Sequence, residues 1–87
     1  MKRKDGFIVR QIADQNVAVA VGEASRTFRG MIKLNGTGLM IWNLLEDDIT
    51  ENGIVAALTE RYEVDDETAR ADVRRFIAVL AEAGIVE

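Results

Sequence analysis

The spacing of apolar residues changes once along this chain, near residues 34–35, and this change limits the possible folds more than any other feature. Before it, apolar and polar residues tend to alternate, which is typical of half-buried strands. After it, apolar residues recur every three or four positions, which is typical of amphipathic helices. Because 87 residues provide for one core, we expect a single α+β domain over 1–87. Its sheet is expected over 6–34 and its helical part over 35–87.

Three strands are predicted before the change. Residues 6–13 and 17–21 contain many β-branched residues, and the turn residues at 14–16 predict a hairpin between them. Residues 22–27 are predicted to be a polar connection. Residues 28–34 (FRGMIKL) alternate strictly and are predicted to form the third strand. A three-stranded antiparallel sheet of this kind must bury one face against the helices.

The third strand is predicted to have one apolar and one basic face, because successive side chains of a strand point to opposite sides. The inward face carries Phe28, Gly30, Ile32 and Leu34. The outward face carries Arg29, Met31 and Lys33. We therefore expect a half-buried strand whose outer side chains are solvated.

Three helices are predicted after the change. The first spans about 36–46, with Asn35 or Thr37 as its N-cap, and is apolar over more than half of its circumference. The second begins at Thr50, and the third runs from an aspartate cap in the stretch 64–66 to a stop at Gly84. Three strands followed by three helices resemble a winged helix-turn-helix, in which the hairpin is the wing.

The residue types that are missing argue against catalysis. The chain has no His and no Cys, so it lacks an imidazole base, a thiolate nucleophile and an ordinary zinc site. Ser25 is the only serine and has no histidine to activate it. The carboxylates of 47–48 and 65–67 stand next to predicted helix starts, where they complement the helix dipole. We expect no catalytic residue, no metal and no cofactor.

Charge and hydropathy limit the partners and the location. The net charge is −4, with an excess of basic residues in 1–33 and of acidic residues in 34–87. An acidic domain is a poor nucleic-acid binder, because phosphate neutralisation supplies most of the non-specific affinity. No apolar stretch reaches the roughly 18 residues of a membrane span, and no apolar segment follows the basic start as in a signal peptide. We expect a cytoplasmic protein that binds neither nucleic acid nor membrane.

An ordered set of short motifs, covering residues 6–87, resembles the PqqD-like proteins. A strand ending in Leu-Asn leads to a helix with small residues and an Ile-Trp pair, and an acidic turn after Tyr-x-Val precedes a helix that ends in Gly-Ile-Val. The matching positions are Leu34-Asn35, Thr37-Gly38, Ile41-Trp42, Leu45, Thr50, Tyr62-Glu63-Val64, Asp72-Val73, Phe76, Leu80 and Gly84-Ile85-Val86. No one motif is unique to the family, but their order is fairly specific.

The resemblance implies a function that composition does not. PqqD-like domains are precursor-peptide recognition elements in the synthesis of ribosomal peptide natural products and of pyrroloquinoline quinone. They bind the leader segment of a precursor and present its core to a modifying enzyme, often a radical SAM protein. In the family the leader adds as an extra strand to the free edge of the third strand, in the cleft beside the third helix. We therefore expect a leader-peptide-binding protein that is not an enzyme, in the pyrroloquinoline quinone pathway or another peptide pathway.

Carried onto this chain, that binding mode implies three groups of site residues. The edge strand is Arg29, Gly30, Met31, Ile32, Lys33 and Leu34, where Arg29 and Lys33 would meet leader carboxylates and Met31 would be an adaptable apolar contact. The opposite wall is Asp72, Arg75, Phe76 and Val79. The floor is Ile41, Trp42 and Leu45.

Each feature has a simpler interpretation. Arg29 and Lys33 are also the kind of charges that keep an exposed edge strand from aggregating. Phe76 and Trp42 are residue types that most often serve only packing. Two other functions stay open: a winged-helix module that places its third helix in a DNA groove, and a structural subunit that forms a homodimer through its edge strand.

Overall fold

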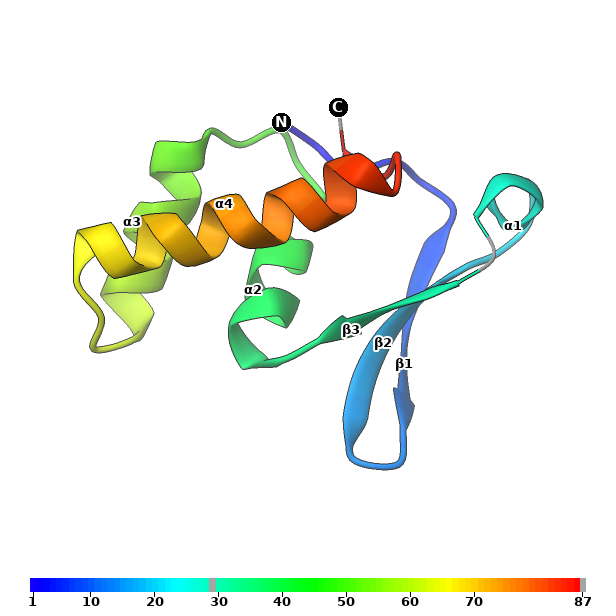
Figure 1. Cartoon of the computed structure of the whole chain (residues 1–87), viewed down its shortest axis with the longest axis horizontal. Coiled ribbons are helices and arrows are strands. Elements are labelled where there is room, and N and C mark those ends of the chain that lie inside the picture. The colour runs from blue at the N-terminus through cyan, green and yellow to red at the C-terminus, as the bar shows by residue number, and fades with distance from the viewer. Residues whose placement is uncertain (29, 87) are drawn as a thin grey trace.

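The computed structural model describes residues 1–28 and 30–86. Its elements, in chain order, are β1 (Phe7–Ile12), β2 (Gln15–Ala20), α1 (Ala24–Thr27), β3 (Met31–Leu34), α2 (Gly36–Leu44), α3 (Glu51–Arg61) and α4 (Asp66–Glu82). Figure 1 shows the sheet on one side of the molecule and the three longer helices on the other, with β3 leading directly into α2. This arrangement confirms the predicted α+β fold, in which a three-stranded antiparallel sheet is followed by helices in a winged helix-turn-helix-like order.

The first two strands form a tighter hairpin than the sequence predicts. Ile12 pairs with Gln15, so only two residues make the turn, and β2 begins two positions before the predicted start at 17. Ala13 has a φ of 56° and is the only residue other than glycine, in the described part, with a positive φ. Two-residue turns need such a backbone because it follows the right-handed twist of the strands. An alanine gives little sequence signal for this conformation, which explains the error.

The connection predicted at 22–27 is partly helical, and the third strand is shorter than predicted. A single turn, α1, follows Gly22, whose carbonyl oxygen accepts a hydrogen bond from Ser25 Oγ at 2.6 Å. Strand β3 begins only at Met31. Phe28, predicted inside that strand, lies before it and packs edge-on against Phe7, with the ring centroids 5.6 Å apart.

The order of the strands in the sheet is β1-β2-β3, so within the described chain β3 pairs only with β2 and is an edge strand. Ala18 pairs with Ile32, and both side chains face the helices, since Ala18 belongs to the core and Ile32 packs against it. Met31 and Lys33 point the other way and are exposed. The predicted alternation of β3 is confirmed over these residues.

Side-chain caps fix the start of each longer helix. Asn35, Thr50 and Asp65 accept hydrogen bonds from the backbone N–H groups of Gly38, Gly53 and Thr68, at 2.7, 3.0 and 2.8 Å. Of the two predicted caps for α2, Asn35 is therefore the one used. After α4, Gly84 takes a φ of 77°, which ends the helix as predicted. No helix in the described ranges is both long and apolar enough to cross a membrane.

The single tryptophan lies in the core, where the sheet meets the helices. Trp42 is 1% exposed, and Phe7 packs edge-on against it at a centroid distance of 5.8 Å. The guanidinium of Arg3 lies 4.9 Å from the centroid of its ring, and Arg3 Nε donates to the Trp42 carbonyl oxygen at 3.0 Å. Trp42 therefore joins the N-terminal segment, β1 and α2.

Candidate functional site

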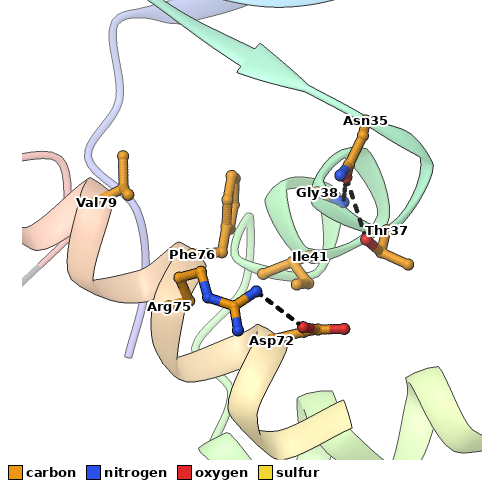
Figure 2. Close-up of a pocket in the computed structure, with 8 residues that line it drawn as sticks. All are labelled: Asn35, Thr37, Gly38, Ile41, Asp72, Arg75, Phe76 and Val79. Atoms are coloured by element: carbon orange, nitrogen blue, oxygen red, sulfur yellow. Dashed lines mark hydrogen bonds and ion pairs between the residues drawn. The ribbon is translucent and has the colours of Figure 1, made fainter. Parts of the chain in front are cut away.

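A cavity of about 240 Å³ opens between the start of α2 and the exposed side of α4. Figure 2 shows the side chains that line it, with Phe76 and Val79 pointing from α4 toward the side on which β3 passes. The lining residues are Asn35, Thr37, Gly38, Ile41, Asp72, Arg75, Phe76 and Val79. Five of these were predicted from the sequence to belong to the site: Ile41, Asp72, Arg75, Phe76 and Val79.

Helix α4 contributes one wall because four of its residues share a face. Positions 72, 75, 76 and 79 are spaced by three or four residues, which brings their side chains to the same side of a helix. Phe76 is half-buried, and Val79 is 47% exposed. Arg75 Nη1 lies 3.2 Å from Asp72 Oδ1, so the two charged residues form an ion pair at one end of an apolar wall.

The first turn of α2 contributes the opposite wall. Asn35 Oδ1 accepts hydrogen bonds from the N–H of Gly38 at 2.7 Å and from Thr37 Oγ1 at 3.1 Å. A Cβ atom on Gly38 would lie 3.0 Å from Asn35 Oδ1 and 3.4 Å from Phe76 Cε1. Glycine at this position therefore allows the capped turn to approach Phe76 closely.

These three residues, Asn35, Thr37 and Gly38, were not assigned to the site from the sequence. Their role depends on the approach of α4, which is far along the chain, and no local pattern reports that contact. The available signal was a glycine in the first turn of an otherwise apolar helix, where glycine costs up to about 1 kcal/mol relative to alanine. A costly glycine of this kind indicates close packing.

The predicted edge strand is present but shorter than predicted. Met31, Ile32, Lys33 and Leu34 form β3, with Ile32 half-buried and Leu34 buried. Gly30 is exposed and precedes the strand, and Arg29 lies outside the described residues. In an antiparallel pair, alternate residues direct their N–H and C=O groups toward the neighbouring strand. Half of the β3 residues therefore direct these groups away from β2, toward the open edge.

The three residues predicted as the floor of the site lie in different places relative to the cavity. All three are buried core residues, with 1% of Ile41, 1% of Trp42 and 0% of Leu45 exposed, and of the three only Ile41 lines the cavity. Successive residues of a helix point about 100° apart. Trp42 therefore packs against Phe7, whereas Ile41 lies beside the α4 residues that line the cavity.

Two of the carboxylates whose pKa is lowered stand at the starts of helices. The hydrogen bonds from the side chain and the backbone N–H of Thr68 lower the pKa of Asp65, the N-cap of α4. Arg74 and Arg70 lower the pKa of Glu51 in the first turn of α3. No group of carboxylates in the described chain could hold a metal ion. The expectation that residues 65–67 serve the start of a helix is confirmed.

Comparison with known proteins gives matches to one family and to one peptide complex. The family described as coenzyme PQQ synthesis protein D (PqqD) matches residues 19–86. A solved structure, "TbiB1 in Complex with the TbiA(beta) Leader Peptide", matches with a TM-score of 0.75 and 30% sequence identity over 100% of this chain and 95% of that chain. No curated protein matches the chain. Since the family match covers most of the sequence and the fold agrees with it, the chain belongs to the PqqD family.

Proposed function

We propose that this protein binds the leader of a ribosomally made precursor peptide as an added strand along β3 and presents the precursor to a modifying enzyme. The observation that carries the proposal is the open edge of β3 beside the cavity on α4. An added strand gains affinity from backbone hydrogen bonds and specificity from pockets for alternate side chains. The similarity to a leader-peptide complex over the whole chain supports this mode of binding.

The edge and the cavity are connected through one short segment. Leu34 is the last residue of β3, and the next residue, Asn35, both caps α2 and lines the cavity. A peptide strand paired with β3 would direct the side chains of one face toward the helices, as Ile32 does. Those side chains would meet the apolar wall formed by Phe76 and Val79.

The charges of α4 favour a peptide ligand over DNA. Glu51 holds two arginines of this helix: Arg70 Nη1 and Arg74 Nε each lie 2.8 Å from one of its carboxylate oxygens. Arg75 is paired with Asp72. These ion pairs neutralise the cations that a recognition helix would offer to phosphates, where free positive charge supplies most of the affinity.

The role that we propose is that of a single, non-catalytic domain. The partners would be the precursor leader and a modifying enzyme, of which a radical SAM protein is the type that we favour. The product would be pyrroloquinoline quinone or another modified peptide. Since precursors are made on ribosomes, this step would take place in the cytoplasm.

A pair of substitutions on α4 tests the proposal. Val79→Asp places a charge on the apolar wall and should weaken leader binding about tenfold or more, because the carboxylate would lose water when an apolar side chain of the leader packs against it. Ala78→Asp adds the same charge at the preceding position, which is exposed and outside the cavity, and should leave binding unchanged. Binding is measured by calorimetry with leader segments of short precursor genes encoded beside this one. Equal affinities for the two variants would contradict the proposed site.

A further inference from the structure

The face of the sheet that points away from the helices has a pattern of its own. The strand register places its side chains in rows across the three strands. One row is apolar: Ile8, Val19 and Met31. The neighbouring row is Arg10, Val17 and Lys33, which is apolar in the middle and basic at both ends.

The outward positions of the two edge strands, β1 and β3, are exposed, and the face carries no acidic residue on its three strands. Ile8 and Met31 are 39% and 54% exposed, and Ile12, on the same face, is 50% exposed. None of the outward positions in the three described strands holds Asp or Glu, although the chain has a net charge of −4. The outer face is therefore a basic and apolar surface on an acidic protein.

Lys33 is the residue of the basic row that lies on the edge strand β3, next to the place where a further strand could pair. Val17 is only 2% exposed although it is outside the core cluster. Its direct neighbours across the strands are Arg10 and Lys33. The hairpin residue Asp14 shares a shallow hollow with Lys33, but the structure records no ion pair between these two residues.

A strand added to β3 would extend both rows by one residue. Residues directly opposite each other in adjacent strands have Cβ atoms about 5 Å apart and point to the same face. The guest residue opposite Met31 would continue the apolar row, and the one opposite Lys33 would meet its ammonium group. The residue between them, opposite Ile32, would point toward the helices.

We propose that this outer face selects the leader through a three-residue pattern: an acidic residue opposite Lys33, then an apolar residue opposite Ile32, then a second apolar residue opposite Met31. The order follows from antiparallel addition, which continues a sheet that is antiparallel throughout. The inference rests on the proposed leader-binding function and adds to it the class of substrate. The protein would thus recognise side chains on both faces of the added leader strand, and not only those that enter the cavity on α4.

The test is to pan a display library of short random peptides against three forms of the protein. These are the natural chain, Lys33→Glu, and the control Lys2→Glu, which makes the same charge change at an exposed residue outside the sheet. Amide NMR shifts of residues 31–34 and of α4 identify the enriched peptides that occupy the groove. We expect the acidic–apolar–apolar pattern with the natural chain and the control, and a basic residue in place of the acidic one with Lys33→Glu. Replacing the acidic residue by lysine should weaken binding to the natural chain about fivefold.

Two negative results can be distinguished. If groove-binding peptides are enriched, but without the acidic residue or with the same pattern for Lys33→Glu, the substrate class proposed here is wrong and leader binding stands. If no enriched peptide shifts the amides of 31–34 or α4, both this inference and the proposed function are contradicted.

Discussion

At the scale of single residues, the site depends on close approach more than on unusual chemistry. Gly38 brings the capped turn of α2 within contact of Phe76, and the Asp72–Arg75 ion pair closes one end of the apolar wall. The wall residues on α4 could be predicted because their spacing along one helix is local information. The residues of the α2 turn could not, since they become lining residues only through packing between distant segments.

Two glycines of α2 provide a matched test of this approach. Gly36→Ala should stabilise the protein by about 0.5 kcal/mol, because its Cβ would meet only Tyr62 Oη, at 3.9 Å, and the unfolded chain would lose entropy. Gly38→Ala should not stabilise the protein, since its Cβ would crowd Asn35 Oδ1 and Phe76. Chemical denaturation measures both. If Gly38→Ala stabilised the protein as much as Gly36→Ala, the space around Gly38 would be larger than the structure shows, and the α2 turn would not lie in close contact with Phe76.

At the scale of elements, the helices were predicted more accurately than the strands. Their caps and stops are set by residues next to the helix ends, so Asn35, Thr50 and Gly84 could be identified from the sequence alone. The start of β2 depends on the backbone of Ala13, and the length of β3 depends on pairing with β2. Strand limits of this kind are set by partners and not by local composition.

The contact between α3 and α4 gives a prediction on pH. Arg74, and then Arg70, lower the pKa of Glu51, so this carboxylate stabilises the folded protein above its unfolded pKa of about 4.3. That contribution should be lost as the pH falls through the lower folded pKa. Glu51→Gln should therefore reduce the free energy of unfolding at pH 7 and have little effect at the lowest pH that keeps the chain folded. Urea titrations across this range measure the difference.

Glu60→Gln is the control for this prediction. Glu60 is exposed on the same helix, and the structure records no ion pair for it. Its substitution should leave the unfolding free energy unchanged at every pH. A pH-independent effect of Glu51→Gln, or an equal effect of Glu60→Gln, would show that the arginine pairs do not hold α3 to α4.

At the scale of the whole molecule, the order of strands and helices leaves one sheet edge open beside one helix. The sheet is open, with β1 at one edge and β3 at the other. Of these two edge strands, β3 is the one that leads directly into the helices. The pattern of strands before helices predicted this arrangement. The three-dimensional packing was needed to find how the open edge of β3 lies relative to the cavity on α4 and to the side chains on the outer face of the sheet.

The most direct measurement of the central claim is amide hydrogen exchange of the labelled protein, with and without precursor leader peptides. Strand addition forms hydrogen bonds to alternate residues only, so alternate amides within Met31–Leu34 should gain protection, together with NMR shifts at Phe76 and Val79. Shifts at α4 without any gain of protection in β3 would contradict strand addition. Protection of β3 that depends on protein concentration, and not on the peptide, would show instead that the edge pairs with a second copy of the chain.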